Sequence, residues 1–234
     1  MKGLNVSDIS KLYKTKTALE PISLTVKEGK CIALCGGNGA GKSTLLNILA
    51  SISSPSSGTV LIDGINMVKQ KKEYVSLIGC MPDEFHAQGE MSVEEFLSFY
   101  ADIRAVSKDR IEEVIASMGL CDKRKELVKN LSKGMRQRLL VGQSILGEPR
   151  LLIMDEPTNG LDPYWINEFI DLIKKLKETG TITVFSTHMM DVAAEIADHV
   201  LFIEKGHLTK TLENDFSDMD GFTKKLLMLY RQTF

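Results

Sequence analysis

The sequence predicts an α/β fold that combines a parallel sheet, an N-terminal antiparallel β part and a helical insert. Three observations predict it. Short apolar runs that end at glycine or acidic residues recur along the chain with helical stretches between them, which is typical of a parallel sheet. The N-terminal segment alternates apolar and polar residues, as half-buried strands do. From Ser92 to about Val141 the apolar residues take helical spacing instead.

The first half of the chain is predicted to form four strands and a helix. Alternating residues predict half-buried strands over 2–9 and 22–28. The run CIALC at 31–35 is apolar throughout and ends in glycines, so we expect a fully buried strand there. A helix is expected over 43–50, and another strand over 59–62.

The helical insert begins with a clear start signal. Ser92 is followed three residues later by Glu95, which is the spacing of a capping box. Strand-type runs return at 151–154, 182–185 and 200–203, with helical stretches between them. We therefore expect a core made of residues 1–85 and 145–212, a helical subdomain over 86–144 and a tail over 213–234 with one short helix at 224–231.

Composition excludes several classes of protein. The 234 residues include only 18 glycines and 6 prolines, so collagen-like and linker-dominated chains are excluded. The 29 basic and 31 acidic residues give a net charge of −2, whereas a nucleic-acid-binding domain is usually basic. We therefore expect no nucleic-acid partner. The four cysteines show no CxxC spacing, and we interpret them as small core residues in a reducing compartment.

The sequence also predicts where the protein works. The N-terminus has no apolar stretch suited to a signal peptide. The longest uncharged stretch, 43–62, contains serines, a proline and a glycine, so it is not expected to span a membrane. We expect a cytoplasmic chain that reaches a membrane only through a partner.

The strongest motif follows the buried strand at 31–35. It matches G-x-x-x-x-G-K-[ST] and comprises Gly36, Gly37, Asn38, Gly39, Ala40, Gly41, Lys42, Ser43 and Thr44. Between a strand and a helix, this motif predicts a P-loop whose backbone N–H groups hold phosphates. Lys42 would reach the β- and γ-phosphates and Ser43 would hold Mg²⁺. An ordinary glycine-rich turn is the weaker alternative, since motif and context agree.

A second motif places two carboxylates after an apolar strand. The run 151–154 leads directly into Asp155 and Glu156, at the end of the strand where ligands bind in open α/β sheets. We expect Asp155 to bind Mg²⁺ and Glu156 to act as a general base on an attacking water. A solvated acidic turn is the alternative, and the phosphate loop disfavours it.

With these motifs the chain resembles, over nearly its whole length, the ATP-binding subunit of an ABC transporter. Residues 131–137, LSKGMRQ, look like the signature motif of that family, which contacts the γ-phosphate bound by the opposite subunit. The resemblance assigns this role to Ser132, Lys133, Gly134 and Met135. Ser132 and Gly134 open a helix in the sequence pattern, so a hydroxyl, backbone N–H groups and the helix dipole could face an anion.

Three further residues match family positions. Asp162, in Gly160–Pro163, matches the D-loop at the dimer seam, and His188, after the strand at 182–185, matches the switch histidine. Tyr13 occupies the place of the aromatic residue that stacks on adenine. A surface tyrosine on a hairpin is a competing interpretation of Tyr13.

The chain also departs from the family pattern. Asp83 stands at the position of the Q-loop glutamine, unless a shifted loop gives that role to Glu84 or Gln88. Lys133 and Met135 replace the more usual glycine and glutamine of the signature. None of these departures removes Lys42, Asp155, Glu156 or His188, so we expect ATP hydrolysis to survive.

The resemblance implies a RecA-like P-loop core and a motor. Two copies, or two related chains, would pair head to tail around two ATP·Mg²⁺ and drive an integral membrane permease. The signature is most similar to those of ABC-2-type exporters, and the stretch from Leu131 to His188 is also similar to the ATPase of the copper-maturation transporter of nitrous-oxide reductase. A soluble ABC ATPase acting on ribosomes or nucleic acid is the main alternative. An unrelated P-loop GTPase or kinase is weaker, because the chain has no NKxD motif.

Overall fold

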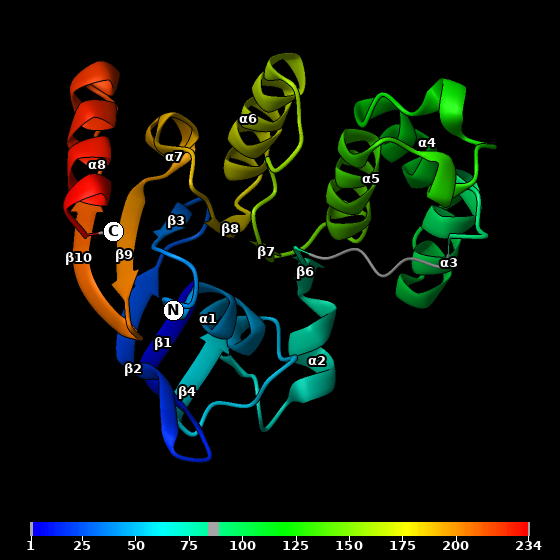
Figure 1. Ribbon diagram of the computed structural model, residues 1–234. Coiled ribbons are helices and arrows are strands. Elements are labelled where there is room, and N and C mark those ends of the chain that lie inside the picture. Colours follow the sequence, from blue (N-terminus) through cyan, green and yellow to red (C-terminus); the bar gives the residue numbers. More distant parts are fainter. Residues whose placement is uncertain (1, 84–88, 234) are drawn as a thin grey trace.

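Two sheets form the centre of the computed structural model, which describes residues 2–83 and 89–233 (Figure 1). The antiparallel sheet has the order β2-β1-β4-β5. Its strands are β1 (Leu4–Tyr13), β2 (Lys16–Val26), β4 (Ser57–Ile62) and β5 (Ile65–Asn66). The larger sheet has the order β10-β9-β3-β8-β7-β6. Its strands are β3 (Cys31–Cys35), β6 (Ile78–Met81), β7 (Leu151–Met154), β8 (Ile182–Ser186), β9 (His199–Glu204) and β10 (His207–Glu213).

Parallel pairing joins five strands of the larger sheet, from β9 to the edge strand β6, and only β10 runs antiparallel, against β9. Alternate residues of β3 enter two different apolar clusters. Cys31, Ala33 and Cys35 pack in one cluster, and Ile32 and Leu34 pack in the other. This is why the run at 31–35 is apolar at every position: both faces of the strand are covered.

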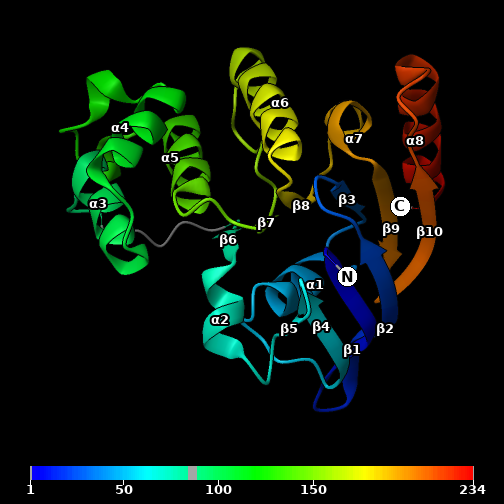
Figure 2. The same ribbon diagram turned by 180° about the vertical axis from the view of Figure 1, so that it is seen from behind.

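The helices divide between those two clusters. Helix α1 (Lys42–Leu49) and the buried Tyr74 of α2 (Lys71–Ser76) join the antiparallel sheet on one face. The other cluster contains residues of α3 (Val93–Arg104), α4 (Lys108–Ser117), α5 (Lys133–Ile145), α6 (Pro163–Glu178), α7 (Met190–Ile196) and α8 (Met219–Thr233). Helices α3, α4 and α5 lie together beside the sheets, as both views show (Figures 1 and 2).

The predicted start of the insert is confirmed. The Ser92 hydroxyl accepts a hydrogen bond from the Glu95 backbone N–H, and the Glu95 carboxylate accepts one from the Ser92 N–H. These two bonds satisfy groups that the first turn of a helix leaves unpaired.

Several elements differ from the sequence expectation. Two strands were not predicted. The short strand β6 contains a glycine, which is uncommon in strands, and the edge strand β10 is mostly exposed and so lacks a regular apolar pattern. The tail helix begins at Met219 rather than residue 224. The Asp218 side chain caps this earlier start by accepting a hydrogen bond from the Gly221 N–H. Cys121 is exposed, so the expectation of a core cysteine is wrong at this position.

The parallel strands fix where chemistry can occur. The loops after β3, β7 and β8 leave from neighbouring strands at the same edge of the sheet. They carry the P-loop, the pair Asp155 and Glu156, and His188. Residues that are more than a hundred positions apart in the chain are therefore brought to one edge.

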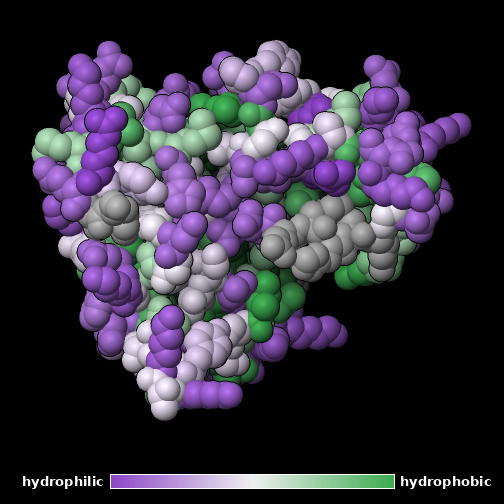
Figure 3. All heavy atoms as spheres, viewed as in Figure 1, coloured by the Kyte–Doolittle hydropathy of each residue, from purple (hydrophilic) through white to green (hydrophobic). Residues whose placement is uncertain are grey.

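Among residues 2–83 and 89–233, no helix is both long enough and apolar enough to cross a bilayer. On the face in Figure 3, hydrophilic residues predominate and apolar ones form small patches.

A buried carboxylate holds the opposite edge of the parallel sheet together. Asp198 lies just before β9, and its side chain accepts hydrogen bonds from the Cys31 backbone N–H and the Lys30 ammonium, each at 2.8 Å. The Lys177 ammonium at the end of α6 lies 2.8 Å from the same carboxylate. Burial opposes its ionisation, but the two lysines and the backbone N–H bring the pKa of Asp198 below its usual value.

We therefore predict that Asp198→Ala lowers the free energy of unfolding by about 2–4 kcal/mol, because it leaves the buried Cys31 N–H without its acceptor and removes the charged partner of Lys30 and Lys177. Urea unfolding at pH 7 measures this. Asp102→Ala, which removes an exposed carboxylate on α3, is the matched control. Equal stabilities for the two variants would show that Asp198 does not tie these elements together.

Candidate nucleotide-binding site

The phosphate loop joins β3 to α1 and is shaped by close backbone contacts. Gly41, which precedes α1, has φ +113°, and a Cβ there would lie 2.9 Å from the Ala18 carbonyl oxygen. Only glycine suits such a position. The Ala40 N–H bonds to the Gly37 carbonyl at 3.1 Å, which closes the turn. The loop therefore presents its backbone at the N-terminus of α1, where an anion is stabilised.

Lys42 is held inside this loop. Its side chain is largely buried, and its ammonium donates hydrogen bonds to the Gly36 carbonyl at 2.6 Å and the Gly37 carbonyl at 3.3 Å. A phosphate bound in the loop would offer this ammonium stronger, charged acceptors.

A cavity of about 540 Å³ opens above the loop, a volume typical of sites for small ligands. Of the residues that the sequence singled out, it is lined by Tyr13, Asn38, Gly39, Ala40, Gly41, Lys42, Ser43, Thr44, Asp83, Glu156 and His188. Lys16, Thr17, Ala18 and Lys205 also line it, and no motif had indicated them.

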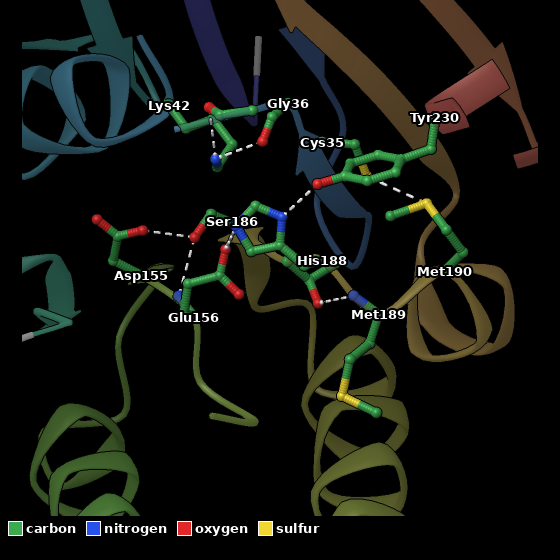
Figure 4. A network of polar contacts seen from close by, with 12 residues as sticks. Cys35, Gly36, Lys42, Asp155, Glu156, Ser186, His188, Met189, Met190 and Tyr230 are labelled. Atoms are coloured by element: carbon green, nitrogen blue, oxygen red, sulfur yellow. Dashed lines mark hydrogen bonds and ion pairs between the residues drawn. The ribbon is translucent and has the colours of Figure 1, made fainter. Parts of the chain in front are cut away.

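Asp155 and Glu156 are joined to the neighbouring strand by one hydroxyl. Ser186, the last residue of β8, donates a hydrogen bond to Asp155 Oδ1 and accepts one from the Glu156 N–H at 2.8 Å (Figure 4). Glu156 has φ +48°, an uncommon backbone conformation for a residue with a side chain. The Gln137 amide of α5 donates a hydrogen bond to the Glu156 carbonyl at 2.9 Å. These bonds hold the strained residue in place.

The Glu156 carboxyl group is suited to taking up a proton. Burial, opposed by Lys42 and reinforced by Asp155, raises the pKa of Glu156 to about 7. Its Oε1 atom is buried and accepts no well-aligned hydrogen bond from the described residues. A carboxyl group that titrates near neutral pH and faces a cavity fits a general base.

His188 touches both Glu156 and the C-terminal helix. Its Nε2 lies 3.1 Å from Glu156 Oε1, and its Nδ1 lies 2.7 Å from the Tyr230 hydroxyl oxygen (Figure 4). Burial and the nearby Lys42 lower the pKa of His188, so its imidazole is neutral at pH 7.

Tyr13 and Asp83 lie at the rim of the cavity. The Tyr13 ring is half exposed, and the Lys11 ammonium lies 4.9 Å from its centre. Asp83 is exposed and borders both this cavity and a smaller one that Asp155 lines. Glu84 and Gln88, the alternatives for its role, lie outside the described residues.

The signature residues form a separate group that does not line this cavity. Ser132 caps α5 by accepting a hydrogen bond from the Met135 N–H at 3.2 Å. A Cβ at Gly134 would lie 2.8 Å from the Gly160 carbonyl oxygen, so only a glycine lets the two loops approach. Lys133 donates a hydrogen bond to the Asn159 side chain, and Asp162 caps α6. The signature therefore contacts the D-loop within one chain.

Magnesium was predicted from the sequence, and its proposed ligands are of the right type. Ser43 and Asp155 offer a hydroxyl and a carboxylate, which are the hard oxygen donors that Mg²⁺ prefers. Within the described residues, no group of three or more histidine, cysteine or acidic side chains could hold a metal alone.

Besides the four lining residues named above, the sequence analysis did not identify three residues that bond the side chains or backbone of Asp155, Glu156 and His188, namely Ser186, Gln137 and Tyr230. Ser186 ends a strand that was predicted one residue shorter, and Gln137 belongs to the signature segment. The sequence motifs therefore lay next to both residues without indicating their roles. Tyr230 was predicted only as part of the tail helix, and no motif indicates its contact with His188.

Comparisons with known proteins show which family the chain belongs to. A family model described as "ABC transporter" matches residues 19–159. The uncharacterized ABC transporter ATP-binding protein YdbJ of Bacillus subtilis is 36% identical over 96% of this chain and 73% of its own. The bacitracin transport ATP-binding protein BcrA of Bacillus licheniformis is 36% identical over 91% and 70%. The lantibiotic transport ATP-binding protein SrtF of Streptococcus pyogenes is 33% identical over 92% and 93%.

Solved structures confirm the predicted fold. An ATP-binding subunit of an ABC transporter superposes with a TM-score of 0.86 at 26% identity, covering 97% of this chain and 100% of the other. The dimeric cassette MJ0796, bound to ADP and phosphate, has a TM-score of 0.83 at 24% identity, covering 90% and 98%. The chain thus belongs to the ABC transporter family, as an ATP-binding subunit that hydrolyses ATP.

Proposed function

We propose that this chain hydrolyses Mg²⁺-bound ATP with Lys42, Glu156 and His188 as its catalytic residues. The observation that carries the proposal is that these three side chains line one cavity beside the phosphate loop. Asn38 to Thr44 would bind the phosphates through backbone N–H groups, and Tyr13 would stack on the base. Ser43 and Asp155 would hold Mg²⁺, which neutralises phosphate charge when bound.

The chemical step follows from the position of Glu156. Its carboxylate takes a proton from a water molecule as the water oxygen attacks the γ-phosphorus. The bond from that phosphorus to the bridging oxygen breaks, and ADP leaves with the bonding electrons. Lys42 and the Nε2 atom of His188 would face the γ-phosphate oxygens, where negative charge must be stabilised.

We further propose that two copies, or two related chains, complete each site. Ser132 and Gly134 lie at the start of α5 outside the cavity of their own chain. A second chain arranged head to tail would bring this helix N-terminus to the γ-phosphate, with Asp162 at the seam. Lys133 and Met135, the neighbouring signature residues, would take part in the same contact between chains. In this arrangement residues 86–144 form the helical subdomain that carries the signature, residues 1–85 and 145–212 form the core, and residues 213–234 form the tail.

The proposed partner is an integral membrane permease on whose cytoplasmic face the dimer sits. Relatives named for bacitracin and lantibiotic transport support a transport partner. Asp83 lies at the end of the first core segment and α3 at the start of the helical subdomain, so a permease helix docked beside both would contact core and subdomain together. Substrate selection would belong to the permease.

Glu156→Gln tests the catalytic role. An amide cannot accept the proton from water, so we expect turnover to fall by at least about 100-fold while ATP still binds. The trapped ATP should also stabilise a dimer, seen by light scattering coupled to size exclusion.

Lys42→Ala is the matched control for that experiment. It should lose both turnover and ATP binding, since it removes the cation that the phosphates need. Unchanged hydrolysis in Glu156→Gln would contradict the role of general base, and a monomer with ATP bound would contradict the shared site.

The raised pKa of Glu156 predicts how stability depends on pH without nucleotide. Between its ordinary value of 4.5 and its folded value of about 7, the folded state holds a proton that the unfolded chain releases. Stability therefore falls as pH rises through this range. Glutamine carries no charge, so the free energy of unfolding of Glu156→Gln should exceed that of the wild type by about 1–3 kcal/mol at pH 8 and by little at pH 5.

Thermal melts at both pH values measure this difference. Glu213→Gln, at an exposed glutamate on β10, should show no such pH dependence. If Glu156→Gln gave the same difference at pH 5 and pH 8, the carboxyl group would not have a raised pKa.

The partner is tested by capture from native membranes. Tagged Glu156→Gln protein with ATP and Mg²⁺ should recover a polytopic membrane protein, identified by mass spectrometry. Lys42→Ala, which cannot form the ATP-bound dimer, controls for non-specific capture. Recovery of ribosomal or DNA-bound proteins instead would favour a soluble ABC ATPase.

A further inference from the structure

The C-terminal helix α8 reaches the catalytic site through the side chain of Tyr230. Leu226 is fully buried and Leu229 nearly so, so the helix is fixed against the core and packs beside α7 (Figure 1). The next residue, Tyr230, places its hydroxyl oxygen 2.7 Å from Nδ1 of His188. The two rings meet edge to face, with centres 6.0 Å apart and planes at 80°.

The direction of this hydrogen bond follows from the charges around it. Burial raises the pKa of the Tyr230 hydroxyl, so it keeps its proton at neutral pH. A neutral imidazole has one N–H and one acceptor nitrogen. Nε2 lies 3.1 Å from Glu156 Oε1. Above pH 7 the Glu156 side chain is mainly a carboxylate, and its negative charge favours an N–H over a lone pair on the facing nitrogen. Nδ1 is then the acceptor, and the Tyr230 hydroxyl donates to it.

We propose that Tyr230 is a positioning residue that holds His188 in its Nε2–H tautomer and in this orientation. The inference rests on the proposed function, in which Nε2 faces the γ-phosphate. An Nε2–H can donate a hydrogen bond to a phosphate oxygen, whereas an unprotonated Nε2 would repel it. The helix α8 is thereby part of the catalytic apparatus, because it fixes which nitrogen of the switch histidine carries the proton.

A purely structural role for Tyr230 makes a different prediction. If the ring only packs between α8 and the loop after β8, then removing its oxygen atom alone would change neither the tautomer nor the rate. The variant Tyr230→Phe makes this distinction, because it keeps the ring and removes only the hydroxyl group.

The first measurement is the tautomer of His188, read from two-bond ¹H–¹⁵N correlations on protein labelled in its four histidines. His188→Gln identifies the His188 signals. Without nucleotide at pH 7.5, the wild type should show an Nε2–H imidazole. Tyr230→Phe should shift it toward a mixture with the Nδ1–H form. An Nδ1–H form in the wild type would overturn the proposal without any variant.

The second measurement is the steady-state hydrolysis of MgATP. Tyr230→Phe should lower kcat by about threefold to tenfold, the rate equivalent of one neutral hydrogen bond. KM should change by less than about twofold, because no phosphate contact of the loop is lost. Thr223→Val, which removes a hydroxyl from the first turns of the same helix, is the matched control and should leave kcat unchanged.

The outcomes separate this inference from the proposed function. A wild type that does not hydrolyse ATP would overturn the proposed function. A wild type that hydrolyses ATP, beside a Tyr230→Phe protein with the same kcat and the same tautomer, would overturn the role of Tyr230. A rise in KM with unchanged kcat would also overturn it, since that result indicates lost substrate binding.

Discussion

The Ser186 hydroxyl makes the contact on which the site depends. It bonds Asp155 and the backbone of Glu156 at once, and so joins the ends of the adjacent parallel strands β7 and β8. The parallel order brings these ends to one edge. Glu156 has an uncommon backbone angle there, φ +48°, and needs further contacts to keep its position. Ser186 and the Gln137 amide hold it. Strand order sets the place of the chemistry, and these two side chains set its geometry.

A second constraint is that the residues lining the cavity and the signature residues lie apart within one chain. The phosphate loop and Glu156 line one cavity, whereas Ser132 and Gly134 at the start of α5 lie outside it, and Gly134 contacts the D-loop of its own chain. The start of α5 is joined to the D-loop segment by the close approach of Gly134 to the Gly160 carbonyl and by the hydrogen bond from Lys133 to the Asn159 side chain.

Most of the fold and the main motifs could be predicted because they depend on local pattern. The P-loop needs glycines at fixed spacing, and the apolar run at 31–35 needs only a strand covered on both faces. Tyr230 and Gln137 could not be predicted as site residues, since their roles depend on contacts between segments far apart in sequence. The strand β6 was missed because it takes its stability from pairing with β7 rather than from its own four residues.

The most direct test of the whole account is a crystal structure of the Glu156→Gln variant with ATP and Mg²⁺. We predict two chains around two nucleotides, with each γ-phosphate between Lys42 and His188 of one chain and Ser132 of the other. The Tyr230 hydroxyl should remain on Nδ1 of that histidine. Nucleotide enclosed by a single chain, with the second signature helix turned away from the phosphates, would contradict the account.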